Sequence, residues 1–360
     1  MVRKKFHTFD FFRFFAFFKV FLLHLPIVAF PFFNFIKAGG EIGVYFFFVL
    51  SGFLITYIIL HEKQETGTIN FKNFMSRRAL RIWPLFYAMI LFAFLTPKIL
   101  DILNLSGSSE GYEPNWLVSL FFLENYQMIF TDSFPNVSPL RVMWSLCVEE
   151  HFYLIWGTAL YFTKLKNIRF LIIGAVIIAL LSRIVFYSNN WAFLDILTNL
   201  DYFAFGAIPA LLLVQKEKQT IDFITSISLP AKTMLVFFVI SYVILSPHFN
   251  FPFKIIVEPI FFGILFSSLI FIILPENSKI TVSEKNIFSK LGIYTYGLYL
   301  THSIVINLFV KIFEKLNLSL TMAWNALLFI ILALIFTIIA SIFSYNYIEK
   351  PFLKLKKYFR

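Results

Sequence analysis

Ionisable side chains inside apolar stretches are the residues of this chain whose type and spacing point to chemistry. Arg13 and His24 lie eleven residues apart in the first apolar stretch, and Asp10 precedes Arg13 by one helical turn. At 100° per residue, eleven residues end about 20° past three full turns, so a helix carries both side chains on one face, about 16 Å apart. Ionisable groups inside membrane-spanning segments are energetically costly and usually functional.

This column of side chains suits a ligand that threads into the protein along the first segment. An anionic head would stay near Arg13, while a reactive end would reach the imidazole of His24, which can accept a proton. In the alternative interpretation, Arg13 extends its charge to the membrane interface and His24 makes a buried structural contact. The shared helix face favours the first interpretation.

Further ionisable clusters lie near the ends of later apolar stretches. The arginines that precede the third stretch either orient the chain in a membrane or bind a phosphate-rich head group; they are Arg77, Arg78 and Arg81. Glu149 and Glu150 are paired carboxylates inside the fourth stretch, where they are expensive. His302 is either a structural histidine or a ligand-contacting one, and Glu349 either caps a helix or supports the site.

Neither a metal centre nor a disulfide is predicted. No spacing of histidines and acids resembles a metal-ligand pattern, although His24, His151 and His302 could converge in the fold. The chain has one cysteine, Cys147, so no intramolecular disulfide can form. We therefore expect no metal and no permanently bound cofactor.

The composition identifies the solvent in which these residues must be positioned. Of 360 residues, 59% are hydrophobic and 14% are charged, and 51 are phenylalanine. An ordinary soluble domain has roughly 25% charged residues, and the mean hydropathy here is +0.80. Because a soluble protein needs polar residues to cover its surface, this chain is predicted to be an all-α, polytopic integral membrane protein.

A membrane span needs about 20 mainly apolar residues. The N-terminal stretch is interpreted as an uncleaved first span rather than a signal peptide, because it carries charges and lacks a small-residue cleavage site. The longest connection, residues 101–145, contains a short apolar piece, 116–130, that suits an interfacial helix. Ten spans are predicted, at residues 10–30, 42–60, 82–100, 146–163, 169–187, 195–214, 233–248, 255–274, 289–310 and 324–345.

The distribution of basic residues predicts the orientation of these spans. With the N-terminus in the cytoplasm, the cytoplasmic segments hold 22 of the 31 lysines and arginines, and the outer segments hold 6. This imbalance alternates from loop to loop, as the positive-inside rule requires. Both termini are therefore predicted to be cytoplasmic. The net charge of +11 reflects these loops, and no nucleic-acid partner is expected.

Six short motifs occur in an order that resembles the acyltransferase 3 family of membrane O-acyltransferases, which modify surface polysaccharides and related glycans. Nearly the whole chain is covered. Phe14, Tyr45 and His151 differ from the residues usual in these motifs. The motifs are Arg13 with His24, the second-span pattern GGEIGVYFFFVLSGFLI at 39–55, the basic loop FMSRRALRIWP at 74–84, WSLCVEEHFY at 144–153, YLTH at 299–302 and YIEKP at 347–351.

The resemblance implies an acyl-CoA-dependent O-acyltransferase in a bacterial cytoplasmic membrane, with acetyl as the default acyl group. The acceptor would be a hydroxyl of a cell-surface or lipid-linked carbohydrate. His24 would act as general base or carry the acyl group, assisted by Glu149 or Glu150, and the arginines named above would bind acyl-CoA. Supporting roles would fall to residues within or beside the motifs, namely Asp10, Ser51, Trp144, Ser145, His302 and Glu349.

Residues 1–360 are expected to form one transmembrane acyltransferase domain without an appended soluble domain. The alternative function is transport of a lipid-linked glycan, with the intramembrane charges lining a pathway. Transporters often have matched repeats with broken helices in two halves, and no such pairing is apparent. A non-catalytic membrane scaffold is a third interpretation, disfavoured by the cost of the buried charges. The acyl chain, the acceptor sugar and the oligomeric state stay open at this point.

Overall fold

The computed structural model describes residues 8–102, 110–275 and 278–359, and these residues form a helical bundle without a β-strand. Predominant helix is what a bilayer demands, since each helix satisfies its own backbone hydrogen bonds. The elements are α1 Thr8–His24, α2 Pro31–Lys37, α3 Ile42–Thr66, α4 Phe71–Ile102, α5 Trp116–Leu120, α6 Glu124–Thr131, α7 Ser138–Arg141, α8 Trp144–Phe162, η1 Leu165–Asn167, α9 Ile168–Ser188, α10 Ile196–Gln215, α11 Glu217–Ser226, α12 Leu229–Leu245, η2 Ser246–His248, α13 Lys254–Ile272, α14 Ile287–Gly292, α15 Thr295–Lys315, α16 Ala323–Ser344, η3 Tyr345–Glu349, α17 Lys350–Lys354 and η4 Leu355–Phe359.

Eight helices in the described ranges are long and apolar enough to cross a membrane, namely α3, α4, α9, α10, α12, α13, α15 and α16. They coincide with eight of the ten predicted spans, which confirms the all-α, multi-pass class. The other two predicted spans are α1, with 17 residues, and α8, with 19 residues. These two helices carry Arg13 and His24, and Glu149 and Glu150, respectively. The predicted orientation of the termini stays a prediction.

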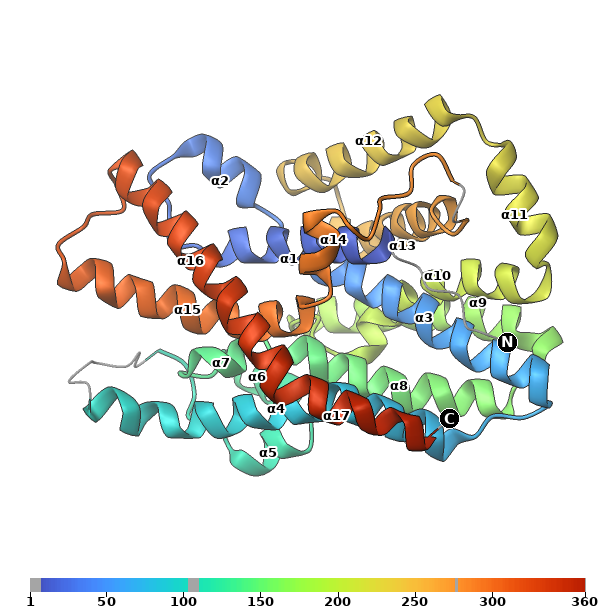
Figure 1. Ribbon diagram of the computed structural model, residues 1–360, viewed down its shortest axis with the longest axis horizontal. Helices are drawn as coiled ribbons and strands as arrows, with labels where there is room; N and C mark the ends of the chain where they lie inside the picture. Colours follow the sequence, from blue (N-terminus) through green and yellow to red (C-terminus); the bar gives the residue numbers. More distant parts are fainter. Residues whose placement is uncertain (1–7, 103–109, 276–277, 360) are drawn as a thin grey trace.

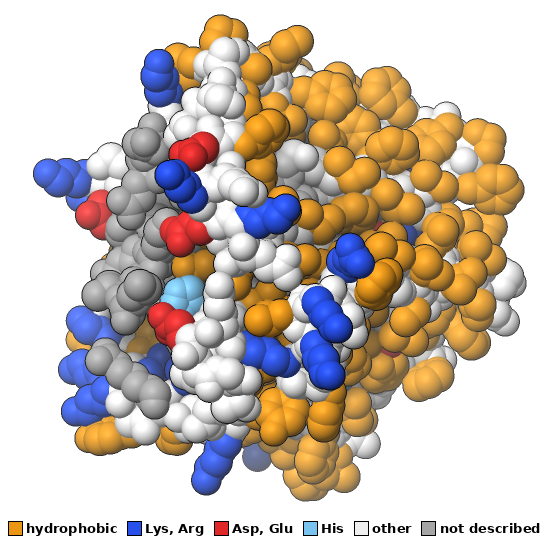
Figure 2. All heavy atoms as spheres, turned by 90° about the vertical axis from the view of Figure 1, so that its right-hand side faces the viewer, with side chains coloured by type: hydrophobic (Ala, Val, Ile, Leu, Met, Phe, Trp, Pro, Cys, Tyr) orange, Lys and Arg blue, Asp and Glu red, His pale blue; other side chains and the backbone are white. Residues whose placement is uncertain are grey.

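The bundle has two ends, which lie at the right and left of Figure 1. We call the right-hand end the basic end: α3 turns into α4 there and the chain finishes there. Lys63 donates hydrogen bonds to the carbonyls of Leu160 and Thr163, which joins α3 to the end of α8. Figure 2 looks onto this end and shows lysine and arginine side chains spread over it. The opposite end carries α2 and the α15–α16 turn (Figure 1).

Helices α3 and α10 form the centre of the bundle and approach each other closely at two glycines. A Cβ atom on Gly52 would lie 2.1 Å from the Phe203 carbonyl oxygen, and one on Gly206 would lie 1.9 Å from that of Val49. Small residues at such crossings let membrane helices pack backbone to backbone. Gly43 allows a similarly close approach of α1 to α3, since a Cβ atom on Gly43 would lie 2.2 Å from the Ala16 carbonyl oxygen.

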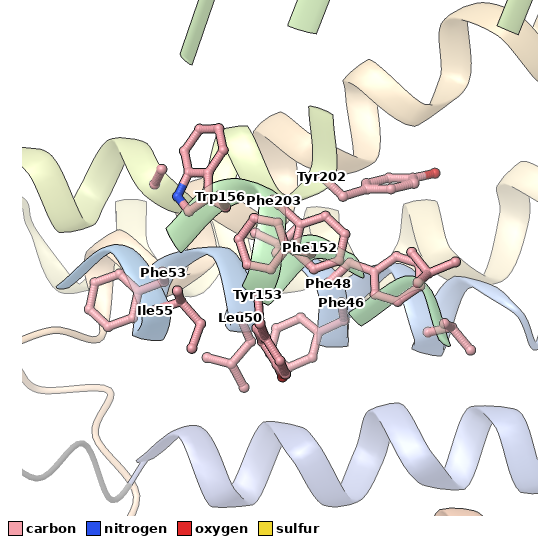
Figure 3. Packing of buried hydrophobic residues seen from close by; sticks show 14 of the residues in the cluster. Phe46, Phe48, Leu50, Phe53, Ile55, Phe152, Tyr153, Trp156, Tyr202 and Phe203 are labelled. Atoms are coloured by element: carbon pink, nitrogen blue, oxygen red, sulfur yellow. The ribbon is translucent and has the colours of Figure 1, made fainter. Parts of the chain in front are cut away.

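Aromatic side chains fill the space between α3, α8 and α10. The rings of Phe152 and Phe203 are stacked with centroids 3.9 Å apart, and Phe48 stacks on Phe203 at 4.9 Å (Figure 3). Stacked rings of this kind add to the contact area that holds helices together where water is absent. The packing keeps α8 against α3, and with it the motif that carries Glu149.

Two predicted segments, 10–30 and 116–130, can be compared with the helices that form there. The predicted first span, 10–30, is longer than the helix, because α1 ends at His24. The helix ends there because Pro26 disfavours a helical conformation of the residue before it. The apolar piece 116–130 was not predicted to span the membrane, and it does not form one long helix. It folds as the short helices α5 and α6, interrupted at Phe122, which has a φ of 60°.

Candidate active site

Two cavities lie inside the bundle and share part of their lining. The narrow cavity, of about 330 Å³, lies toward the basic end between α1, α3, α4, α8 and α15. The wide cavity, of about 1040 Å³, lies toward the opposite end between α1, α3, α9, α10 and α13. Val44 and Tyr299 line both cavities. These two side chains therefore form a wall that separates one cavity from the other.

The lining of the narrow cavity is strongly cationic. Four basic side chains face it, those of Arg13, Arg78, Arg81 and Lys356, and its lining includes a single carboxylate, Glu149. Of these four, Arg81 is an exposed side chain, whereas Arg13 and Arg78 are partly buried. Clustered guanidinium groups bind phosphates through charge-assisted hydrogen bonds. This cavity is suited to an anionic, phosphate-bearing ligand.

Glu149 is held in place by two hydroxyl groups. Ser51 Oγ donates to its Oε1 at 3.1 Å, and the Tyr153 hydroxyl donates to its Oε2 at 2.7 Å. Arg78 and Arg81 interact with it electrostatically. The predicted supporting residue Ser51 thus connects α3 to the motif on α8. Glu149 has the surroundings of a carboxylate that balances the arginine cluster.

Arg13 and His24 occupy one face of α1, as the spacing predicts, but they face different cavities. Arg13 forms an ion pair with Asp10 and lines the narrow cavity. His24 is the last residue of α1 and lines the wide cavity. The helix therefore passes along the wall between the two cavities, with a cation on one side and an imidazole on the other.

The imidazole of His24 is fixed by a backbone carbonyl and a second histidine. Its Nδ1 lies 2.9 Å from the Val20 carbonyl oxygen and 3.3 Å from Nε2 of His302. Nδ1 of His302, in turn, lies 2.6 Å from the Tyr299 carbonyl oxygen. His302 is completely buried, whereas His24 is exposed to the wide cavity.

These contacts determine where the protons lie when both rings are neutral. A carbonyl oxygen only accepts, so Nδ1 of His302 carries a proton and its Nε2 has a free lone pair. By the same argument Nδ1 of His24 carries a proton, which it shares between the Val20 oxygen and His302. The free lone pair of His24 is then on Nε2. His24 is arranged to act as a base through that atom.

The wall between the cavities is held by hydroxyl groups from the WSLCVEEHFY motif and α15. The Tyr299 hydroxyl donates to the Val142 carbonyl at 3.1 Å and lies 2.8 Å from Ser145 Oγ. Ser145 lines the narrow cavity and its neighbour Trp144 lines the wide one. The predicted supporting residues Trp144 and Ser145 therefore stand on the two sides of this wall.

Five predicted residues do not line either cavity, namely Asp10, Arg77, Glu150, His302 and Glu349. Arg77 donates to the Phe359 carbonyl at 2.6 Å and pairs with Glu62 at 3.3 Å, which ties α4 to the end of the chain. Glu150 accepts a hydrogen bond from Trp83 at 3.2 Å. Glu349 is buried, accepts from Ser344 at 3.4 Å and interacts electrostatically with Arg81.

The partner of His24 differs from the expected one. Glu149 or Glu150 was expected to orient the imidazole or to accept a relayed proton, and the side chain hydrogen-bonded to the ring in the described structure is His302. The reason is the register of α8, which directs Glu149 toward Ser51 on α3. His151 lies apart, beside the ring of Tyr126 at 5.5 Å. Among the described residues, no group of three or more His, Cys, Asp or Glu side chains could hold a metal ion.

Some residues at these cavities escaped the sequence analysis. Glu258, inside the eighth predicted span, lines the wide cavity, and the rule that an ionisable group in a span is functional would have selected it. Lys356 reaches the narrow cavity because the C-terminal segment folds back along α4. Tyr202 carries no such signal, and the YLTH motif marks Tyr299 without indicating its place between the two cavities.

Comparison with known proteins defines the class. A family model described as an acyltransferase domain matches residues 6–346, and the chain belongs to this family of acyltransferases. The chain is 29% identical to the peptidoglycan O-acetyltransferase OatA of Listeria monocytogenes over 353 residues, which cover 88% of this chain and 52% of the relative. No solved structure matches.

Two further relatives carry similar names. The putative peptidoglycan O-acetyltransferase YrhL of Bacillus subtilis is 30% identical over 338 residues, covering 87% of this chain and 50% of the relative. A putative O-acetyltransferase of Staphylococcus aureus is 32% identical over 161 residues, covering 42% of this chain and 26% of the relative. The chain thus spans about half the length of the first two relatives.

Proposed function

We propose that this protein transfers an acetyl group from acetyl-CoA to a hydroxyl of a cell-wall glycan, with peptidoglycan as the acceptor. Membership of the acyltransferase family supports the transfer, and the names of the two relatives aligned over most of this chain support acetyl and peptidoglycan. The membrane-spanning helices support a reaction within a bacterial membrane. Transport of a lipid-linked glycan is not proposed, because the family assignment favours group transfer.

The narrow cavity supports the choice of donor. Coenzyme A carries several phosphate charges, and Arg13, Arg78, Arg81 and Lys356 supply cations around this cavity. The phosphates would stay at the basic end, at the exposed Arg81, while the acyl-pantetheine arm extends inward. The thioester must then pass between Val44 and Tyr299 to reach the wide cavity, where the acceptor hydroxyl would meet it.

His24 would act as the general base. Its Nε2 takes the proton from the acceptor hydroxyl as that oxygen attacks the thioester carbonyl carbon. The new C–O bond forms, the C–S bond breaks, and the proton passes from His24 to the departing thiolate of CoA. His302 keeps the other ring nitrogen protonated through its 3.3 Å contact, so that the basic atom is always Nε2.

The observation that carries this proposal is the position of His24. Its ring lines the wide cavity directly beside the wall shared with the cationic narrow cavity. A base at that position can serve a donor that comes from one side and an acceptor that comes from the other. Such an arrangement would hold the two substrates apart until their reacting atoms meet.

The test compares wild type with His24→Ala in lipid nanodiscs. Acetyl-CoA with a radiolabelled acetyl group and soluble peptidoglycan fragments are supplied, and both CoA release and label transfer are followed. Because removal of a general base costs about 10²–10⁴-fold in rate, we expect a loss of that size with little change in the KM for acetyl-CoA. Near-normal turnover by His24→Ala would contradict the role of His24. A wild type that neither binds nor consumes acyl-CoA would favour transport.

A further inference from the structure

A group of polar side chains from α10, η2 and α13 lines the wide cavity. Tyr202 on α10 and Ser246 on η2 are each only 1% exposed, and both line this cavity. In the described part of the chain the Tyr202 hydroxyl has no hydrogen-bond partner, and Ser246 Oγ lies beside the Glu258 carboxylate. Buried hydroxyls without partners are uncommon in folded proteins, because each loses its bonds to water.

A carboxylate joins these hydroxyls. Glu258 lies inside α13 and its side chain is 16% exposed. Lys254 Nζ is 3.7 Å from Glu258 Oε1, and the hydroxyls of Ser246 and Tyr242 lie beside the same carboxylate, which can accept further hydrogen bonds. Lys254 itself donates to the carbonyls of Ser246 and Phe249. A carboxylate in a membrane helix with unused acceptor capacity is a costly feature that a ligand would satisfy.

The neighbouring ion pair shows that this region is not loosely built. Arg183 on α9 and Asp201 on α10 are completely buried and form two hydrogen bonds, at 2.9 and 2.7 Å. Arg183 also donates to the Thr198 carbonyl at 3.0 Å. The pair is therefore held by three hydrogen bonds, although Arg183 Nε has no partner among the described residues, and neither has the Tyr202 hydroxyl beside it.

Aromatic rings surround the open polar groups. Tyr45 stacks on Tyr202 at a centroid distance of 4.6 Å, and Trp144 and Trp191 line the same cavity. In Figure 3 the ring of Tyr202 extends away from Phe203 and the aromatic core, with its oxygen at the far end. Binding sites for small molecules usually combine such an apolar and aromatic lining with a few placed polar groups.

We propose that Tyr202, Ser246 and Glu258 form a specificity subsite that binds the acceptor carbohydrate. The carboxylate accepts hydrogen bonds from ring hydroxyls, and the two side-chain hydroxyls can donate or accept. The ligand is thus an uncharged sugar ring with several hydroxyl groups, held while another hydroxyl reaches His24. The inference rests on the proposed function and deepens it, because it assigns acceptor binding to residues separate from the base.

The test measures donor and acceptor steps separately in nanodiscs, with soluble peptidoglycan fragments as the acceptor probe. Tyr202→Phe removes only the open hydroxyl, and Glu258→Gln removes the charge with little change in shape. We expect each variant to raise the KM for the fragments about three- to tenfold, since a hydrogen bond contributes about that factor. The KM for acetyl-CoA and the slow release of CoA without acceptor are expected to match wild type.

Matched controls use the same substitutions far from both cavities. Tyr161→Phe and Glu314→Gln change exposed residues that line neither cavity and are expected to keep the wild-type KM for both substrates. Equal acceptor KM values in Tyr202→Phe, Glu258→Gln and the controls would overturn the subsite and indicate that water alone satisfies these groups. If wild type releases no CoA at all, the proposed function fails and the subsite with it. Ser246→Ala gives a third, independent measurement of the acceptor KM, which we expect to rise.

Discussion

The narrow cavity and the wide cavity meet at Val44 and Tyr299, yet their linings have different chemistry. Around the narrow cavity, four cations stand against a single carboxylate, and the volume is about 330 Å³. The wide cavity has a volume of about 1040 Å³ and a lining rich in aromatic rings, with His24 on one side and Glu258 on another. The first suits a slender anion and the second suits a bulkier, uncharged ligand.

This difference shows how one bundle can serve two unlike substrates. Unpaired cations in a low-dielectric setting are expensive. Arg141, Arg183 and Lys254 at the wide cavity each donate hydrogen bonds to protein acceptors. The cations of the narrow cavity outnumber its single carboxylate, so ligand phosphates can balance them. Burying aromatic rings and a few hydroxyls costs less free energy than burying unpaired charges, and such groups line much of the wide cavity. Under the proposed function, this excess of cations favours the narrow cavity for the donor and leaves the wide cavity for the acceptor.

The largest further effect on kcat is expected from substitution of His302, which contacts both the Tyr299 carbonyl and the imidazole of His24. In His302→Ala, Nδ1 of His24 loses one of its two acceptors, so the ring is free to turn. We expect kcat to fall about tenfold to a hundredfold, as for a buried group left without its partner, with both KM values unchanged. Steady-state kinetics with each substrate varied separately would measure this.

A conservative variant distinguishes positioning from stability. The side-chain oxygen of Asn in His302→Asn can accept the proton of His24 Nδ1, so part of the lost kcat should return. If Ala and Asn at this position behave alike, or if the acceptor KM carries the whole effect, His302 does not position the base. Thermal unfolding of each variant would show whether the fold is kept.

A smaller effect is expected at the mouth of the narrow cavity. Arg81→Ala should raise the Kd for CoA about tenfold, because the loss of a charge-assisted contact is partly offset by screening at this exposed position. Affinity for peptidoglycan fragments should not change. Calorimetric titration with CoA at two salt concentrations would measure both the loss and its salt dependence. An unchanged Kd would mean that Arg81 only orients the chain.

The smallest effect is expected at Arg77, which offers a matched control on the same helix. Its guanidinium already pairs with Glu62 and bonds to the Phe359 carbonyl, and it does not line either cavity. Arg77→Ala should change the Kd for CoA less than threefold, although the attachment of the C-terminal segment to α4 weakens. A loss as large as that in Arg81→Ala would extend the donor site beyond the narrow cavity.

Much of this architecture follows from the sequence. Each of the ten predicted spans corresponds to a helix, because runs of apolar residues of the right length leave few alternatives in a bilayer. The common face of Arg13 and His24 follows from helical periodicity alone. The order and spacing of the six motifs are enough to indicate the acyltransferase family.

The cavities themselves could not be predicted, because they depend on how helices pack. Periodicity places Arg13 and His24 on one face but does not say that a wall crosses that face between them. The contact of His302 with His24 joins residues 278 positions apart. Likewise, nothing in the sequence around Tyr202 indicates that its hydroxyl lacks a hydrogen-bond partner among the described residues.

The most direct test of this two-sided account uses sealed vesicles in which the protein has one orientation. Acetyl-CoA and peptidoglycan fragments are supplied on the same side or on opposite sides of the membrane, and acetylated fragments are quantified. The account predicts product only when acetyl-CoA is at the basic end and the fragments are at the opposite end. Efficient transfer with both substrates on one side would contradict it.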